Sequence, residues 1–175
     1  SLRSIVFLGT GASSHIDVAA AERLGIRVRT VRHYGDRTVA EHAFALLLSA
    51  ARHVSRMDRE IRAGRWLPAE GIELRGRTLG LVGLGGIGRT VAAKCSALGA
   101  TVVGVHRRQV DADVSRILGM DRLGDALALA DAVVLCLPAT DQTYHVVDRQ
   151  ALSRLRPGTT LVNVAGAAAV SSQHY

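Results

Sequence analysis

A glycine-rich stretch near the middle of the chain constrains its fold more than any other feature. The segment from Leu79 to Gly88 reads LGLVGLGGIG and places the pattern G-x-G-x-x-G between a strand-like and a helix-like segment. In this context Gly83 permits a tight turn, Gly85 lets the backbone approach a pyrophosphate, and Gly88 lets the helix pack closely on the strand. A helix beginning near Ile87 offers free N–H groups to phosphates. The pattern therefore predicts a dinucleotide site, with an ordinary structural turn as the alternative.

The strand expected after the glycine loop bears on which dinucleotide binds. A strand from Thr101 to His106 is followed by Arg107 and Arg108, and the first acid after it is Asp111. NAD-binding folds usually place an acid at the end of this strand, where it accepts hydrogen bonds from the ribose hydroxyls. Paired guanidiniums bind a 2′-phosphate instead. We therefore expect His106, Arg107 and Arg108 to favour NADP(H) over NAD(H); the alternative is that the arginines are merely solvated.

From Thr78 onward the chain alternates between strand-like and helix-like segments. Strands are expected at 78–82, 101–106, 132–137 and 160–164, and helices at 87–98, 123–130 and 148–155. Because the strands are nearly continuous in Leu and Val, both faces of the sheet should be buried by helices. The pattern predicts an α/β fold with a doubly wound parallel sheet of the Rossmann type.

The first third of the chain predicts a smaller strand-helix-strand unit followed by a long helix. The small unit has strands at 4–8 and 26–31 and a helix at 18–24 capped by Asp17. The long helix is expected from Val39 to Ala63, because its apolar residues recur at helical spacing. Thr38 and Glu41 form a capping-box pattern at its start.

Composition excludes several classes of function. The chain has 175 residues and a net charge of +7, but its arginines are dispersed and only 3% of residues are aromatic, which argues against nucleic-acid binding. No apolar run reaches the roughly 20 residues of a membrane span. Cys95 and Cys136 read as buried reduced thiols, which predicts a cytoplasmic protein. The histidines lack ligand spacing, so we expect no metal site.

Several segments resemble, in order, those of the D-isomer-specific 2-hydroxyacid dehydrogenase family. The similar segments are 38–41 at the start of the long helix, 64–66, 74–80, 131–143 with a pattern close to D-V-V-x-x-x-L-P-x-T-x-x-T, 156–158, and 161–165 reading LVNVA. The resemblance extends over nearly the whole chain, from about Ile5 to Ala165.

This resemblance implies a two-domain organisation and a reaction. Residues 36–170 would form the Rossmann-type NAD(P)-binding domain, residues 1–35 a remnant of a flavodoxin-like substrate domain, and residues 171–175 a tail. The family's activity is hydride transfer between nicotinamide and C2 of a 2-oxo or 2-hydroxy acid, in the cleft between domains. The resemblance also implies a homodimer that uses the helix from Val39 to Ala63.

The resemblance further implies the positions of ligand-binding residues. Besides Gly83, Gly85, Gly86, Ile87 and Gly88, the positions that border the cofactor in the family are Thr38, Leu137, Pro138, Thr143, Val164 and Ala165. The turn Thr10-Gly11-Ala12 resembles the substrate-domain loop whose backbone N–H groups hold the substrate carboxylate. Exposed N–H groups in a glycine turn do form an anion-binding nest.

The sequence departs from the family pattern at the catalytic residues. The family carries arginine directly after the N-V-A strand, where this chain has Gly166 and Ala167. The family's catalytic histidine and acid lie in later segments that the sequence does not contain. His174 is a candidate general acid/base because histidine titrates near neutral pH, although no orienting carboxylate is evident. The chain thus reads as an incomplete dehydrogenase, either a truncated product or part of a longer molecule.

Two functions from different classes remain open at this stage. One is an NAD(P)-dependent oxidoreductase that acts on a small 2-oxo or 2-hydroxy acid. The other is a non-catalytic NAD(P)-binding module, or degenerate remnant, that binds cofactor and dimerises without turnover. Only the first predicts consumption of the reduced cofactor.

Overall fold

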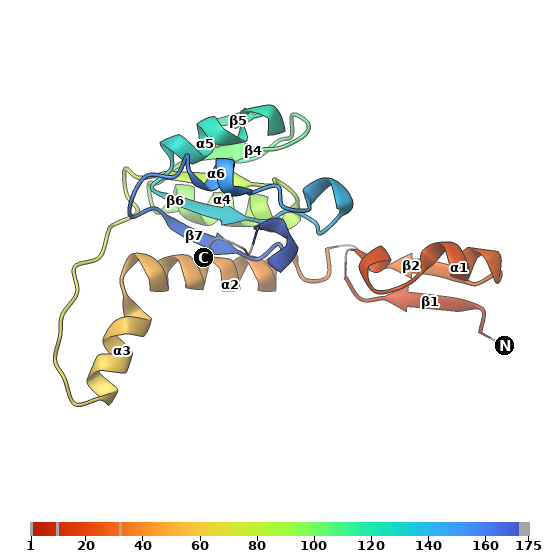
Figure 1. The fold of residues 1–175 in the computed structure, drawn as a ribbon, viewed down its shortest axis with the longest axis horizontal. Helices are drawn as coiled ribbons and strands as arrows, with labels where there is room; N and C mark the ends of the chain where they lie inside the picture. Colours follow the sequence, from red (N-terminus) through yellow and green to blue (C-terminus); the bar gives the residue numbers. More distant parts are fainter. Residues whose placement is uncertain (1, 10, 32, 172–175) are drawn as a thin grey trace.

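The described residues, 2–9, 11–31 and 33–171 of a computed structural model, form two parallel sheets (Figure 1). The larger sheet has five strands in the order β5-β4-β3-β6-β7. Its strands are β3 (Thr78–Val82), β4 (Thr101–Val105), β5 (Arg116–Leu118), β6 (Ala132–Leu135) and β7 (Thr160–Asn163). All its strand pairs are parallel, which confirms the predicted Rossmann-type α/β fold.

The core of the large sheet follows from the period of two along its strands. In β3, Leu79 and Leu81 point into one apolar cluster and Val82 into another, on the opposite face. In β6, Val134 and Val133 divide between the same two clusters. Because both faces are buried, the central strands carry apolar residues at successive positions rather than alternate ones.

Helices cover both faces of this sheet. The helices α2 (Asp36–Ala51) and α4 (Gly86–Ala97) contribute to the cluster on one face, while α5 (Leu123–Leu129) contributes to the other. The short α6 (Arg149–Leu152) packs beside α5. Large apolar residues of the strands are therefore fully buried from both sides, which is the expected doubly wound arrangement.

The smaller sheet pairs β1 (Ser4–Phe7) with β2 (Arg27–Thr30) in parallel. The helix α1 (Val18–Arg23) connects them, and the Asp17 carboxylate caps it by accepting the Ala20 N–H at 2.8 Å. This strand-helix-strand unit, drawn in red and orange in Figure 1, lies apart from the large sheet and reaches it through the segment before α2.

The structure corrects the prediction of one long helix from Val39 to Ala63. Two helices occupy this region, α2 and α3 (Val54–Arg62), because His53 between them has a left-handed φ of 54° that interrupts the helical hydrogen bonding. The first helix also begins earlier, at Asp36 with Gly35 as its N-cap, so Thr38 is not the cap. In Figure 1, α3 and the segment after it extend away from the sheets.

Two further observations concern the described ranges. The three-residue strand β5 was absent from the predicted strands. Within those ranges, no helix combines the length and the apolar character that a membrane crossing requires.

Candidate functional site

The large sheet has a topological switch point beside β3. From β3 the chain moves outward to β4 and β5 and then returns to the opposite side of β3 to form β6 and β7. The loops that leave the carboxyl ends of β3 and β6 therefore diverge and leave a crevice between them. In open α/β sheets this crevice is where ligands bind.

The glycine loop at this crevice is shaped by three steric requirements. Gly83 has a φ of +98°, and a Cβ there would lie 2.9 Å from the Cys136 carbonyl. A Cβ at Gly88 would overlap the Gly83 carbonyl oxygen, so only glycine lets α4 start this close to β3. Gly85, the N-cap of α4, faces open space with nothing within 4 Å of its Cβ position. Gly83 and Gly88 thus make room for protein atoms, whereas Gly85 leaves room for a ligand.

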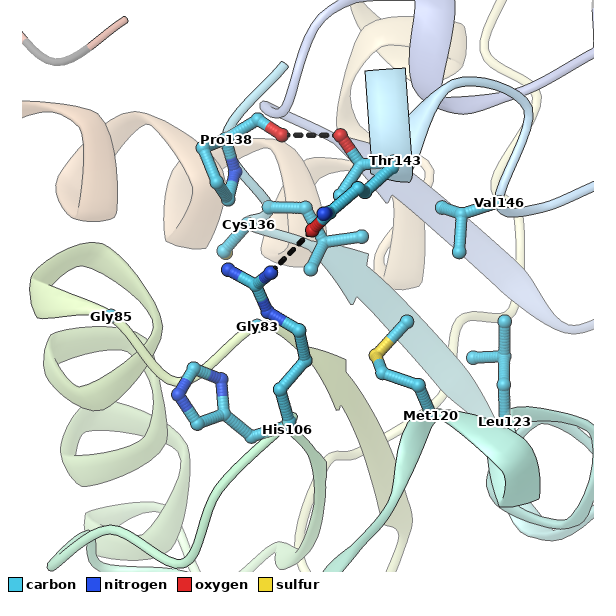
Figure 2. Close-up of a pocket in the computed structure, with 12 residues that line it drawn as sticks. Gly83, Gly85, His106, Met120, Leu123, Cys136, Pro138, Thr143 and Val146 are labelled. Atoms are coloured by element: carbon cyan, nitrogen blue, oxygen red, sulfur yellow. Dashed lines mark hydrogen bonds between the residues drawn. The ribbon is translucent and has the colours of Figure 1, made fainter. Parts of the chain in front are cut away.

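A pocket of about 510 Å³ opens beside this loop (Figure 2). It is lined by Gly83, Gly85, His106, Arg107, Met120, Leu123, Cys136, Leu137, Pro138, Gln142, Thr143 and Val146. Seven of these residues were expected at the cofactor site. Sequence reasoning missed the other five, Met120, Leu123, Cys136, Gln142 and Val146. The predominantly apolar wall with a polar rim is typical of a small-molecule site.

His106 stands where NAD-binding folds usually carry an acid, and it contacts the glycine loop directly. Its Nδ1 accepts a hydrogen bond from the Leu84 N–H at 3.2 Å, which requires that nitrogen to be unprotonated. Burial lowers the pKa of His106, and the positive charges of Arg107, Arg89 and Arg108 lower it further. The ring is therefore held neutral, and it fixes the loop without adding charge to the pocket.

Arg107 and Arg108 differ in their relation to the pocket. Arg107 lines it, and its Nη1 donates a 2.6 Å hydrogen bond to the Gln142 side-chain oxygen, drawn as a dashed line in Figure 2. Arg108 is exposed and does not line the pocket, although its charge reaches His106. Within the described ranges, neither arginine forms an ion pair with a carboxylate.

The opposite wall of the pocket is a turn after β6 that is fixed by one side chain. Thr143, buried at the end of the 3₁₀ helix η3 (Asp141–Thr143), donates its hydroxyl to the Pro138 carbonyl at 2.6 Å. The same hydroxyl oxygen accepts the Thr140 N–H at 2.9 Å. Figure 2 shows Thr143 and Pro138 on the same side of the pocket. The two threonines of the T-x-x-T pattern thus hold the pocket wall in place.

A second recess lies where the linker between the two sheets meets the glycine loop. Its lining includes Thr38 and Ile87, so these two expected cofactor residues face this recess rather than the pocket beside Gly85 and His106. The Asp36 carboxylate lies against Gly86, where any Cβ would overlap it, and accepts the His33 Nδ1 hydrogen at 2.6 Å. Because Asp36 covers Gly86, the open part of the glycine loop is the Gly85 side.

The remaining expected residues lie at the ends of strands or outside the described ranges. Val164 and Ala165 directly follow β7, and the Asn163 side-chain oxygen accepts the Ala165 N–H at 2.9 Å. In the proposed substrate turn, Gly11 has a φ of +90° and Ala12 is buried. Thr10 and His174 lie outside the residues that the structure describes.

The two cysteines are not nucleophiles at neutral pH. Burial raises the pKa of Cys95 to about 11. Burial raises the pKa of Cys136 to about 12, with a smaller contribution from the charge of Cys95. Since only the thiolate attacks, Cys136 serves the pocket as an uncharged wall.

Comparison with known proteins decides the family. The family model "D-isomer specific 2-hydroxyacid dehydrogenase, NAD binding domain" matches residues 44–174, most of the chain. The chain belongs to the D-isomer-specific 2-hydroxyacid dehydrogenase family. This match agrees with the order of motifs in the sequence and with the glycine loop at the switch point of the sheet. It identifies the matched region as a nicotinamide-cofactor-binding domain.

Individual members of the dehydrogenase family match almost the whole chain. D-3-phosphoglycerate dehydrogenase of Mycobacterium leprae is 36% identical over 94% of this chain and 31% of its own length. Hydroxypyruvate reductase of Thermotoga maritima is 32% identical, with 94% and 54% covered. The crystal structure of a glyoxylate reductase from Paecilomyes thermophila superposes with a TM-score of 0.86 at 29% identity, covering 97% of this chain and 52% of that one. The chain thus spans about a third to a half of these relatives.

The described residues fit a dinucleotide cofactor. Open space at Gly85, the N–H groups at the start of α4 and the adjoining pocket provide an anion site beside an apolar slot. The dehydrogenase family supplies the expected chemistry, in which the nicotinamide carries the hydride.

Proposed function

We propose that this chain is the cofactor-binding part of an NADP(H)-dependent oxidoreductase that transfers hydride between nicotinamide and C2 of a small 2-oxo or 2-hydroxy acid. The glycine loop and pocket at the switch point carry the proposal, together with membership of the 2-hydroxyacid dehydrogenase family. The relatives named phosphoglycerate dehydrogenase, hydroxypyruvate reductase and glyoxylate reductase support this class of substrate.

In this proposal the chain's residues divide the binding of the cofactor among them. The N–H groups at the start of α4 hold the pyrophosphate on the open Gly85 side, next to Gly86 and Ile87. The apolar pocket holds the adenosine. Leu137, Pro138 and Thr143 line this pocket, and the positions expected to border the rest of the cofactor are Thr38, Val164 and Ala165. The turn at Gly11 and Ala12 holds the substrate carboxylate with its backbone N–H groups.

The preference for NADP(H) rests on the charge around the end of β4. Arg107 and Arg108 follow His106, and no carboxylate of the described residues pairs with either arginine. A guanidinium free of acids attracts a 2′-phosphate, whereas the neutral His106 cannot accept the ribose hydroxyls as a carboxylate would.

The proposed activity is tested on the complete enzyme of which this chain is the proposed cofactor-binding part, by following NADPH and NADH oxidation with a panel of 2-oxo acids that includes glyoxylate and hydroxypyruvate. We expect turnover with NADPH preferred, and no turnover with aldehydes or ketones that lack the carboxylate. Cofactor binding without any turnover would support the non-catalytic module instead.

The organisation of the molecule completes the proposal. We place the boundary between the substrate and nucleotide parts at residues 35 and 36, where α2 begins.

We also propose a homodimer that uses α2 and α3, because Trp66 next to α3 is 80% exposed and contributes to an apolar recess with Ile61 and Leu67. Sedimentation velocity should give twice the monomer mass. The two free thiols favour a reducing, cytoplasmic compartment.

A further inference from the structure

Among the residues that the structure describes, a hydrogen bond between Arg107 and Gln142 joins the two walls of the pocket. Arg107 comes from the segment directly after β4, and Gln142 comes from η3 after β6. Their side chains meet at 2.6 Å, from Arg107 Nη1 to Gln142 Oε1, although 35 residues separate them in sequence. Both residues line the same pocket, so this bond fixes a guanidinium at the entrance of the proposed adenosine site.

The turn that carries Gln142 is well fixed. Its neighbour Thr143 is buried and forms hydrogen bonds to Pro138 and Thr140, which come just before Gln142 in the turn. The backbone of Gln142 is therefore held in place by its neighbour. Its hydrogen bond to Arg107 then restricts the rotatable bonds of both side chains relative to that support.

The chemistry of the amide matters as much as its position. A glutamine oxygen accepts from the guanidinium but carries no charge, so the positive charge of Arg107 is not neutralised. A glutamate at the same place would form an ion pair with Arg107 and would repel a phosphate. The adjacent Asp141 forms no ion pair with Arg107 in the described part of the chain.

We propose that Gln142 is a positioning residue that sets the preference of the pocket for a 2′-phosphorylated dinucleotide. It holds the Arg107 guanidinium across the pocket in a fixed, still fully charged state, so that one Arg107 N–H group is satisfied by the protein and the others remain for the phosphate. This inference rests on the proposed function, because it presumes that the pocket holds the adenosine of the cofactor.

The test compares two ligands that differ only in the 2′-phosphate, 2′,5′-ADP and 5′-AMP, by calorimetric titration. For Gln142→Glu we expect binding of 2′,5′-ADP to weaken on the order of tenfold or more, the effect of one charge-assisted hydrogen bond, with 5′-AMP nearly unchanged. For Gln142→Leu, which frees Arg107 but keeps its charge, we expect a smaller loss of about twofold to tenfold for 2′,5′-ADP alone.

Gln150→Glu is the matched control. Gln150 is exposed on α6 and does not line the pocket, and this variant makes the same change in net charge. Thermal unfolding of all variants verifies that the fold is retained.

The outcomes separate the inference from the proposed function. If the unmodified protein binds neither ligand, the proposed cofactor site is wrong. If it binds both ligands equally, the pocket does not read the 2′-phosphate and Gln142 has nothing to position. If it prefers 2′,5′-ADP and Gln142→Glu keeps the same preference as Gln150→Glu, the proposed function stands and the role of Gln142 is wrong. Equal tightening of both ligands by Gln142→Leu would show that Gln142 obstructs the pocket, which also contradicts the inference.

Discussion

At the scale of single residues, His106 links the charge of the site to the shape of the glycine loop. Its unprotonated Nδ1 accepts the Leu84 N–H, and its pKa lies below the usual 6.5 because of burial and the nearby arginines. A protonated ring would lose this hydrogen bond and would face three positive charges. The neutral form therefore stabilises the folded loop.

This coupling predicts a pH dependence of stability. The unfolded chain takes up a proton on His106 near pH 6.5, whereas the folded chain does so only at lower pH. The contribution of His106 is thus fully present above pH 6.5 and is lost as the pH falls from 6.5 through the lowered pKa. His106→Asn keeps an acceptor but cannot titrate. In urea unfolding between pH 8 and 5, this variant should lose less stability than the unmodified protein.

A histidine outside the site provides the control for this measurement. His42 is exposed on α2, away from the glycine loop, so His42→Asn is the matched substitution outside the site. Parallel curves for the unmodified protein and His106→Asn would show that His106 titrates alike in the folded and unfolded chain.

At the scale of elements, the start of α4 separates the requirements of folding from those of binding. Gly88→Ala places a Cβ onto the Gly83 carbonyl, so α4 must move away from β3, and we expect a loss of about 1–3 kcal/mol in the free energy of unfolding. Gly85→Ala meets open space at a φ of −71°, which alanine adopts without strain. Its stability should stay within about 0.5 kcal/mol.

Cofactor binding should respond differently in the two variants. Gly85→Ala fills the space that the proposed pyrophosphate needs, so NADPH binding should weaken on the order of tenfold or more, about 1.4 kcal/mol or above. Chemical denaturation and fluorescence titration of the same samples give both quantities. Unchanged NADPH binding by a fully folded Gly85→Ala would mean that the ligand does not approach the loop there.

Some helices and strands could be predicted from the sequence, and others could not. The strands β3 and β6 were predicted because a doubly buried parallel strand needs consecutive Leu and Val, and this requirement is local. The strand β5 has only three residues, including the charged Arg116, and owes its pairing to its neighbour β4. The interruption between α2 and α3 lies at His53, a residue without the helix-breaking character of proline or glycine. The strand β5 thus depends on a tertiary contact, and no local sequence pattern marks the interruption at His53.

The residues that line the pocket were likewise predicted only in part from the sequence. The glycine loop, His106, Arg107 and Thr143 were found because each belongs to a motif with a fixed place on a strand end. Met120 and Leu123 follow the strand that was missed, and Gln142 lies inside the T-x-x-T pattern at a position with no chemistry of its own. Its importance depends on the three-dimensional distance to Arg107.

At the scale of the whole molecule, the site depends on segments that are far apart in the chain. The glycine loop follows β3, Arg107 follows β4, Gln142 follows β6, and Asp36 at the start of α2 covers Gly86. The five-stranded sheet brings these segments together at one edge because all its strands run in the same direction. Through its hydrogen bond to His33 in the linker, Asp36 also connects the smaller sheet to the start of α4.

The central claim is that this edge of the sheet binds NADP(H) and reads its 2′-phosphate through Arg107. The most direct test is a titration of the purified protein and of Arg107→Ala with NADPH and NADH at fixed ionic strength. We expect both cofactors to bind, NADPH more tightly, and Arg107→Ala to weaken NADPH by about tenfold to a hundredfold while NADH is nearly unchanged. The absence of binding, tighter binding of NADH by the unmodified protein, or an equal loss for both cofactors in Arg107→Ala would contradict the claim.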